Sequence, residues 1–253
     1  MENPIVSVEN LSLAYPASRE GHVLENVNFT AERGERIALV GANGAGKSTL
    51  LLSMVGIIPA HTGTITIDGL SVTHANLAAV RRAAGLVFQN PDEQLFMPTL
   101  IEDVAFGPRN WAKLSEKSGK PAPSSAEIER RCAAQLDALN IGHLKNRLSH
   151  KLSGGEKRLG ALASVLVMEP ALLLLDEPTA FLDPKSRRRL IAVLNELPQT
   201  MIIATHDIDF AAAVCGRALI LAAGQGKTAA TIRADGSASG IFADTALMED
   251  CGL

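Results

Sequence analysis

Apolar positions along the chain follow two patterns, which predict two kinds of β-strand. Between Ile5 and Leu13, apolar residues are interspersed with Ser and Glu, which is typical of antiparallel strands with one face open to water. Residues 37–40 are instead apolar throughout, as expected of a parallel strand that is covered on both faces. A second N-terminal strand is predicted at residues 27–31, and further buried strands at 85–88, 171–175 and 201–205.

Helical patterns separate several of these strands, at residues 47 to about 55 and at 184–196. Alternating strands and helices predict an α/β core with a mostly parallel sheet. The predicted parts are an α/β core with an N-terminal antiparallel β subdomain at 1–89 and 169–222, an inserted helical subdomain at 90–168, and a weak hairpin with a short terminal helix at 223–253.

The inserted subdomain is predicted to be helical because residues 90–168 show several helical patterns and no strand pattern. Ser124 and Glu127 have the spacing of a capping box, which predicts a helix from there through Leu139. The stretch 113–125 before it is polar and rich in Pro, Gly and Ser, so it is predicted to be a loop.

Composition and charge restrict the class of protein. The chain has 253 residues, of which 47% are hydrophobic and 20% are charged, and these values are typical of a soluble globular protein. The net charge of −3 gives no general electrostatic case for nucleic-acid binding. Three scattered cysteines predict free thiols in a reducing cytosol. Neither a signal peptide nor a membrane-spanning stretch is expected, although the chain could sit on a membrane by binding another protein.

The most specific motif is GANGAGKST at residues 41–49, which fits G-x-x-x-x-G-K-[ST] and lies between a predicted strand and a helix. Its glycines allow backbone N–H groups to turn toward phosphate oxygens, and the helix N-terminus adds partial positive charge. Lys47 would reach the β- and γ-phosphates, and the Ser48 hydroxyl would ligate Mg²⁺. The strand–helix context disfavours the alternative, a glycine-rich turn without a ligand. The predicted nucleotide contacts are Gly41, Asn43, Gly44, Ala45, Gly46, Lys47, Ser48 and Thr49.

Two carboxylates follow the apolar run of LLLLDEP at residues 172–178. Asp176 suits a second contact to Mg²⁺, and Glu177 could orient an attacking water. The alternative is that both acids cap the next turn, but a phosphate loop in the same chain favours the catalytic interpretation. Asp183, before Pro184, is a good start for a helix, and this is compatible with a role at the site.

Two further residues have open interpretations. His206 follows an apolar strand, where a lone His is more often structural. Tyr15 is the only tyrosine, and it could lie in the core or stack on a base.

A second glycine motif, LSGGEK at residues 152–157, directly precedes a long helical pattern. This predicts a second helix N-terminus with bare N–H groups, and therefore a second anion site. One nucleotide needs only one phosphate loop, so a second one on a separate subdomain suggests that the triphosphate is contacted from two sides. The predicted contacts there are Ser153, Gly154, Gly155 and Glu156.

Together these motifs resemble those of the ATP-binding cassette (ABC) ATPases over nearly the whole chain. The resemblance implies a P-loop NTPase core in which two subunits pair head to tail, and each signature closes over the ATP of its partner. The matching elements are Tyr15, the Walker A loop at 41–49, the Q-loop at Gln89, the signature at 152–156, Walker B at 172–176, Glu177, the D-loop at 180–183 and His206.

The resemblance also implies roles for single residues. Tyr15 is expected to stack on adenine, and Gln89 to contact Mg²⁺ and the attacking water. Glu177 is expected to polarise that water, and His206 to contact the γ-phosphate. Asp183, in the D-loop, is expected to lie at the nucleotide site.

Within the family, QNPDEQLF at residues 89–96 followed by EDVAFGP at 102–108 most resembles ATPases of energy-coupling-factor importers, with the cobalt or nickel branch nearest. This implies an ATP-hydrolysing subunit, peripheral on the cytoplasmic face of the cell membrane. It would form a homodimer, or a dimer with a paralogous ATPase, and work with a transmembrane coupling subunit and a substrate-binding membrane subunit. Leu95, Phe96 and Met97 are candidates for the groove that grips a coupling helix, or they pack inside the subdomain.

Three positions depart from the family pattern, and three other functions remain in view. Glu156 stands where glutamine is commoner, Phe181 where a small residue is usual, and the loop at 111–125 is longer than usual. The alternatives are an importer ATPase for a vitamin such as biotin, a soluble ABC ATPase of repair or translation, and a small P-loop kinase. The second usually has a long coiled coil or two cassettes, and the third has no use for the 152–156 motif. Cobalt or nickel rests on the resemblance alone.

Overall fold

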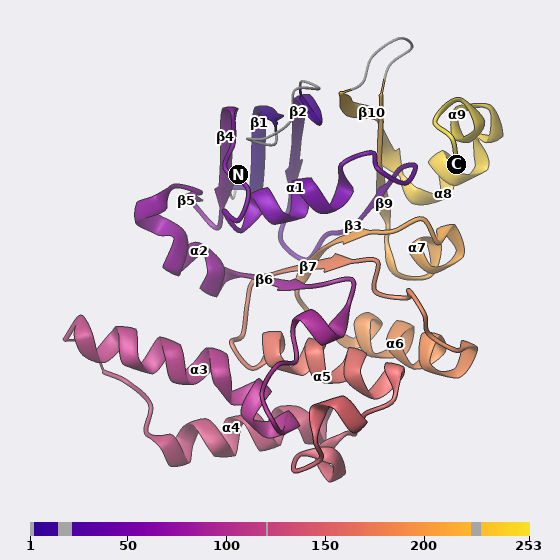
Figure 1. The fold of residues 1–253 in the computed structure, drawn as a ribbon. Coiled ribbons are helices and arrows are strands. Elements are labelled where there is room, and N and C mark those ends of the chain that lie inside the picture. The colour runs from indigo at the N-terminus through magenta and orange to yellow at the C-terminus, as the bar shows by residue number, and fades with distance from the viewer. Residues whose placement is uncertain (1–2, 15–21, 120, 224–228) are drawn as a thin grey trace. The chain divides into compact units, whose positions relative to one another are not determined.

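The computed structural model describes residues 3–14, 22–119, 121–223 and 229–253 (Figure 1). The chain divides into two compact units. Unit 1 comprises residues 1–86, 171–178 and 194–253, and unit 2 comprises 87–170 and 179–193. Tyr15, for which base stacking was expected, lies outside the described residues.

Unit 1 contains the sheet, except for the last residue of strand β6. Over the described residues the strands follow the order β5-β4-β1-β2-β10-β9-β3-β8-β7-β6. Their bounds are β1 Val6–Leu13, β2 Leu24–Ala31, β3 Arg36–Val40, β4 Thr62–Ile67, β5 Leu70–Ser71, β6 Ala84–Val87, β7 Leu172–Asp176, β8 Thr200–Ala204, β9 Arg217–Ala223 and β10 Ala230–Ser237.

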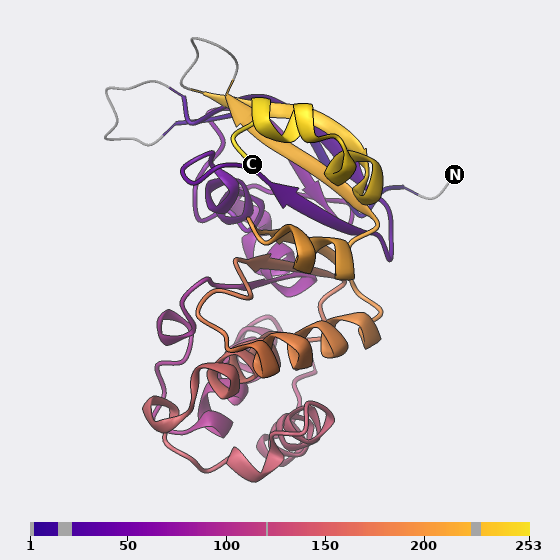
Figure 2. The same ribbon diagram turned by 90° about the vertical axis from the view of Figure 1, so that its right-hand side faces the viewer.

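Strand pairing confirms the predicted fold class. β1 pairs with β2 and β4 in antiparallel fashion, whereas β3 pairs with β8 and β9 in parallel and β7 with β8 in parallel. The strand predicted at 27–31 begins earlier, at Leu24. The hairpin predicted near the C-terminus is β9 with β10, and two short helices follow it where one was expected, α8 Ala238–Ala243 and α9 Thr245–Asp250. α8 packs against both strands of the hairpin (Figure 2).

One hydrophobic core joins the two kinds of strand in unit 1. Leu11 and Leu24 from the antiparallel strands, Ile37 and Leu172 from the parallel ones, and Leu50 from a helix are all buried in it. Helix α1 packs on β7 and β8, so the first residue of α1 is held near the ends of those strands. The helices described in this unit are α1 Lys47–Met54, η1 His74–Asn76, α2 Leu77–Ala83 and α7 Ile208–Val214, in addition to α8 and α9.

Unit 2 is helical over its described residues. Helices α3, α4 and α5 pack on one another, and a bridge between Thr99 and Leu148 is the strand-like pairing found there. The elements are η2 Pro91–Glu93, α3 Leu100–Lys117, α4 Ser125–Ala138, η3 Gly142–Leu144, η4 Ser149–Lys151, α5 Gly154–Leu166 and α6 Pro184–Glu196, whose last three residues belong to unit 1.

The predicted loop at 113–125 is wrong in its first part, because α3 continues to Lys117. Ala112 and Ser115 are buried, as are Val104 and Pro108 earlier in the helix. This spacing of three or four residues shows that one helix face keeps packing through a segment that is polar in composition. Tertiary burial therefore sets the end of the helix.

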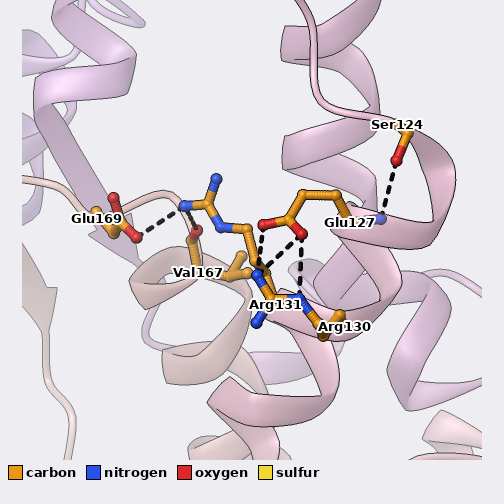
Figure 3. A network of polar contacts seen from close by, with 6 residues as sticks. All are labelled: Ser124, Glu127, Arg130, Arg131, Val167 and Glu169. Carbon is orange, nitrogen blue, oxygen red and sulfur yellow. Dashed lines mark hydrogen bonds and ion pairs between the residues drawn. The ribbon is translucent and has the colours of Figure 1, made fainter.

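Helix α4 starts as predicted, with the Ser124 hydroxyl accepting a hydrogen bond from the Glu127 N–H at 3.2 Å (Figure 3). The Glu127 side chain pairs with Arg130 at 2.8 Å, so only the first of the two bonds of the predicted capping box forms at α4. The next residue, Arg131, donates to the Val167 carbonyl at 3.5 Å and to Glu169 at 2.8 Å. Arg131 therefore holds α4 against the C-terminal end of α5.

The three cysteines are buried free thiols. Burial raises the pKa of Cys132 to about 11 and that of Cys215 to about 12, so neither thiol is reactive near neutral pH. Among the described helices, none is long and apolar enough to cross a bilayer.

Candidate nucleotide-binding site

The loop between β3 and α1 contains two glycines in backbone conformations that other residues disfavour. Gly44 and Gly46 have φ angles of 83° and 93°, in the left-handed region that side chains disfavour. A Cβ on Gly46 would lie 2.6 Å from Leu24 Cδ2, and one on Gly41 would lie 2.3 Å from the Leu221 carbonyl oxygen. The loop is therefore packed tightly against β2 and β9.

This loop leaves the start of α1 suited to an anion. The N-cap, Gly46, makes no side-chain capping bond, and the first turn of α1 contains no acidic residue. The N-terminus of a helix carries partial positive charge from unpaired N–H groups. The residues present thus fit a polyphosphate such as that of ATP.

Lys47 is folded into the same loop. Its Nζ atom donates to the carbonyl oxygens of Gly41 at 2.7 Å and Ala42 at 3.1 Å, and lies 4.0 Å from Glu177 Oε1. Burial lowers the pKa of Lys47 below its usual value, while the charges of Glu177 and Asp176 act to raise it. The ammonium group of Lys47 thus lies between the carbonyl groups of its own loop and the carboxylates of Asp176 and Glu177.

Oxygen donors for a divalent cation occur beside Lys47. Ser48 is the second residue of α1, and Asp176 is the last residue of β7. A hydroxyl and a carboxylate are hard ligands of the kind that Mg²⁺ prefers, so this donor set fits that ion.

Glu177 lies at the centre of a polar cluster at the ends of β7 and β8. Its side chain is only 9% exposed, and its Oε2 atom lies 3.0 Å from His206 Nδ1. The Thr205 hydroxyl donates to the same oxygen at 3.3 Å, and the backbone N–H of Glu177 donates to the Ala204 carbonyl at 2.8 Å. Parallel pairing of β7 with β8 brings these residues together.

This cluster excludes a core position for His206 and adds one residue. His206 lies beside the buried carboxylate with its side chain 62% exposed, so its ring is not a core residue. Thr205 is completely buried, and it was missed from the sequence. The available signal was a hydroxyl at the end of an apolar strand, but its importance depends on which strand lies next to it.

In unit 2, the signature motif forms the start of α5, but two of its N–H groups are occupied where bare ones were expected. The Ser153 hydroxyl accepts from the Glu156 N–H at 3.4 Å, and Glu156 Oε2 accepts from the Ser153 N–H at 2.7 Å. This is a complete capping box, so two of the donors are used internally. The hydrogen bond from the Ser153 backbone lowers the pKa of Glu156, and Arg147 at 3.8 Å adds to this effect.

The start of α6 lies beside the signature glycines. A Cβ on Gly155 would lie 2.4 Å from Ser186 Oγ, and that hydroxyl donates to Asp183 Oδ2 at 2.6 Å. Asp183 Oδ1 accepts from the N–H groups of Lys185 and Ser186 at 2.9 and 3.0 Å, so Asp183 caps α6 as expected. Phe181, just before it, is 94% exposed and has a φ of 61°.

The opening part of unit 2 contains the remaining candidates. Gln89 is exposed, and its carbonyl oxygen accepts from Arg158 at 2.7 Å. Of the three groove candidates, Leu95 is buried and Phe96 is 60% exposed, while Met97 is half-buried. Leu95 thus packs inside the subdomain.

Unit 1 therefore brings together the 41–49 loop, Asp176, Glu177 and His206, and unit 2 holds Gln89, the signature and Asp183.

Comparison with known proteins identifies the family. Residues 24–180 match the profile of the ABC transporter family. The energy-coupling factor transporter ATP-binding protein EcfA of Methanothermobacter thermautotrophicus is 39% identical to this chain, over 98% of this chain and 76% of that protein. The protein of the same name from Methanoculleus marisnigri is 44% identical to this chain, over 81% of this chain and 72% of that protein.

Solved structures agree with this match. The protein cbiO1 from Clostridium perfringens, part of the ABC transporter complex cbiONQ, is 34% identical with a TM-score of 0.78, over 98% of this chain and 94% of that one. A dimeric ATP-binding cassette, MJ0796, in a post-hydrolysis state bound to ADP and Pi, is 26% identical with a TM-score of 0.77, over 92% and 98%. The chain thus belongs to the ABC transporter family as an ATP-binding subunit of the energy-coupling-factor type, an ATPase whose hydrolysis is coupled to transport.

Proposed function

We propose that this chain dimerises around two ATP molecules and powers import of a transition-metal ion, cobalt or nickel, through a membrane partner. The observation that carries the catalytic part is the buried Glu177 carboxylate, held within reach of Lys47 and His206. In this role the chain sits on the cytoplasmic face of the membrane, bound to a transmembrane coupling subunit and a substrate-binding subunit.

The chemistry proposed for unit 1 is phosphoryl transfer to water. The N–H groups of the 41–49 loop and the Lys47 ammonium bind the β- and γ-phosphates, and this arrangement favours the charge that develops on the γ-phosphoryl group. The Glu177 carboxylate accepts a hydrogen bond from the attacking water and orients it. Thr205 and His206 hold that carboxylate in place, and the exposed face of the His206 ring contacts the γ-phosphate. Ser48, Asp176 and Gln89 would hold Mg²⁺, which would supply positive charge to the phosphate oxygens.

Dimerisation is proposed because unit 2 presents a second set of anion-binding groups. Gly154 and Gly155 leave the start of α5 without side chains, and Ser153 adds a hydroxyl. In a head-to-tail pair, these groups of one subunit close over the ATP that the partner subunit holds. The related cassette MJ0796 is dimeric in its structure with ADP and Pi, which supports dimerisation.

Coupling to a membrane partner is proposed at two aromatic residues of unit 2. Phe96 and Phe106 are 60% and 41% exposed, and their rings meet edge to face with centroids 4.8 Å apart. An exposed aromatic pair suits the apolar face of a helix from another protein. The metal-ion solute is supported by the resemblance of residues 89–96 and 102–108 to cobalt and nickel importers. The second candidate is import of a vitamin such as biotin, because the names of the EcfA relatives specify an energy-coupling factor transporter and no metal ion.

One experiment tests the proposal as a whole. The chain is purified from detergent-solubilised membranes with its membrane subunits, reconstituted in vesicles, and assayed for ATP turnover and for uptake of Co²⁺, Ni²⁺ and biotin. Wild-type protein is expected to take up a metal ion, and Glu177→Gln is expected to lower turnover by about 10² to 10⁴-fold, the range for loss of a general base, and to stop uptake.

Glu177→Gln is also expected to accumulate as an ATP-bound dimer on gel filtration, because binding is retained while hydrolysis is slow. Wild-type turnover in this variant would remove the catalytic assignment. Biotin uptake without metal uptake would favour the second candidate. Purification with nucleic acid and without membrane proteins would contradict both.

A further inference from the structure

One face of α5 is bonded to the segment that contains both glutamines of QNPDEQLF. Lys157, Ala161 and Ser164 are spaced by four and three residues, so they share one side of the helix, and Arg158 borders that side three residues before Ala161. Each of them bonds to a residue between Phe88 and Gln94. The course of this segment is therefore set by the helix that begins at the signature motif.

Arg158 makes the first part of this attachment. Its guanidinium group donates to the carbonyl oxygens of Phe88 and Gln89, both at 2.7 Å. Arg158 is only 2% exposed, and the planar fork of a guanidinium group suits two neighbouring acceptors. The two peptide groups that flank the Gln89 side chain are therefore oriented by α5.

Gln94 makes the second part. Its Oε1 atom accepts from the Phe88 N–H at 3.1 Å, and its Nε2 atom donates to the Ala161 carbonyl at 2.8 Å and the Ser164 hydroxyl at 3.0 Å. One amide side chain thus joins the start of the segment to α5 and closes the segment into a loop. Phe88 is held at both its N–H and its carbonyl group.

Further contacts fix the rest of the segment to the same helix. Asp92 pairs with Lys157 at 2.6 Å, and Asn90 caps η2 by accepting from the Asp92 N–H at 3.1 Å. Leu95 packs where α5 carries a glycine, since a Cβ on Gly160 would lie 3.5 Å from Leu95 Cδ1.

The aromatic residues beyond the segment are tied to unit 2 by Asp103. Its Oδ1 atom accepts from the N–H groups of Phe96 and Met97 at 2.9 and 2.8 Å, and its Oδ2 atom accepts from the Ser149 hydroxyl at 2.7 Å. Ser149 lies four residues before the signature serine. Residues 88–97 and the start of α5 are therefore linked at several points.

We propose that Gln94 is a positioning residue for ATP hydrolysis, which acts with Arg158 to fix Gln89 on α5 so that Gln89 moves together with the signature helix. This deepens the proposed function and rests on the role given there to Gln89. The two glutamines thus have different tasks, because Gln89 reaches the reacting groups and Gln94 sets where Gln89 lies.

The test is a double-mutant cycle in the full chain, comparing Gln94→Ala, Gln89→Ala and the double variant. Gln94→Ala is expected to lower the turnover number about 10- to 100-fold, the scale of a misplaced catalytic group, and to raise the Mg²⁺ concentration for half-maximal activity. It is expected to leave the KM for ATP near the wild-type value. In the Gln89→Ala background, Gln94→Ala is expected to cause no further loss of turnover.

Ser164→Ala is the matched control, because it removes one of the two acceptors of the Gln94 amide and leaves the other. It is expected to change turnover less than twofold. Gln94→Glu keeps the acceptor for the Phe88 N–H. If Gln94→Ala does not fold, Gln94→Glu takes its place in the double-mutant cycle. Circular dichroism and hydrogen exchange at the Phe88 amide report the fold and the loss of the contact.

Two outcomes overturn the inference in distinguishable ways. Equal losses from Gln94→Ala in both backgrounds, with Gln89→Ala itself impaired, would mean that Gln94 does not act through Gln89. Wild-type turnover in Gln89→Ala would contradict the role proposed for Gln89, and the inference about Gln94 would fail with it.

Discussion

Helices α1 and α5 both begin within glycine-rich motifs, yet the N–H groups of their first turns differ in how far the chain itself satisfies them. At α1 the N-cap is Gly46 in a left-handed conformation, without a side-chain capping bond or an acid in the first turn. At α5 the N-cap is Ser153, and Glu156 completes a capping box. One helix start is open, and the other is partly satisfied by its own side chains.

The difference separates binding from stability. An uncapped N-terminus leaves unpaired donors, which cost stability until an anion binds. A capping box stabilises its helix by about 1 kcal/mol but uses donors that a phosphate would otherwise contact. We infer that α1 is specialised for tight phosphate binding, and that α5 is built to be stable first and to bind the partner's ATP more weakly.

The largest expected effect comes from replacing the N-cap of α1 in Gly46→Ala. The added Cβ would clash with Leu24, and the alanine would have to adopt a φ of 93°. We therefore expect a loss of about 1–3 kcal/mol in the free energy of unfolding. Distortion of the phosphate loop is expected to lower ATP turnover about 10²-fold. Thermal melts and a phosphate-release assay measure the two.

Gly34→Ala is the control for this variant, because Gly34 has a φ of 77° and nothing within 4 Å of an added Cβ. It shares the backbone strain but lies outside the phosphate loop. Turnover close to wild type is expected for Gly34→Ala. If both variants lost turnover equally, strain alone would explain the effect of Gly46→Ala.

A smaller effect is expected from removing the N-cap hydroxyl of α5 in Ser153→Ala. Loss of the cap should lower the free energy of unfolding by about 1 kcal/mol. Loss of the hydroxyl proposed to contact the partner's ATP should lower turnover about tenfold, on the order of one charge-assisted hydrogen bond. Chemical denaturation and steady-state kinetics measure both quantities.

Ser124→Ala is a matched comparison for the hydroxyl, since the Ser124 side chain likewise accepts from the N–H three residues later at the start of α4. It is expected to cost similar stability and to leave turnover unchanged. Equal kinetic losses in the two variants would mean that Ser153 serves only the helix.

Much of unit 1 was predictable because its signals are local. A continuous apolar run indicates a covered strand, and a glycine-rich turn between strand and helix indicates a phosphate loop. Thr205 escaped because its contact with Glu177 depends on the pairing of β7 with β8, whose residues are far apart in the chain.

Unit 2 was less predictable, because its contacts are mostly tertiary. The end of α3 is set by buried Ala112 and Ser115, which composition does not reveal. The task of Gln94 depends on which face of α5 lies beside it. The spacing of Ser153 and Glu156 is that of a capping box, as is the spacing of Ser124 and Glu127, but only the first pair completes one. The two glycines between Ser153 and Glu156 indicate bare N–H groups instead, so the sequence alone does not separate the two possibilities.

The smallest expected effect comes from Glu156→Gln, which keeps an oxygen acceptor for the Ser153 N–H and removes the charge. A negative charge at a helix start stabilises the helix by about 0.3–1 kcal/mol, and the same charge repels an incoming phosphate. We therefore expect a slightly less stable chain whose ATP-driven dimer forms about two- to fivefold more readily at low salt, a ratio that follows from the same free energy. Sedimentation with ATP in the Glu177→Gln background measures the dimer, and a weaker dimer would contradict the repulsion.

The stability difference between wild type and Glu156→Gln also has a pH dependence with a definite sign. The pKa of Glu156 is lowered in the folded chain from its usual 4.5, so the ionised carboxylate stabilises the fold above that pH. The stabilisation is lost as the pH falls through the lowered pKa, because the proton then binds in both states. The difference in melting temperature should be present at pH 7 and should vanish in acid. A difference that persisted at low pH would assign the stability loss to the geometry of the amide, and the charge would then matter only for the partner's ATP.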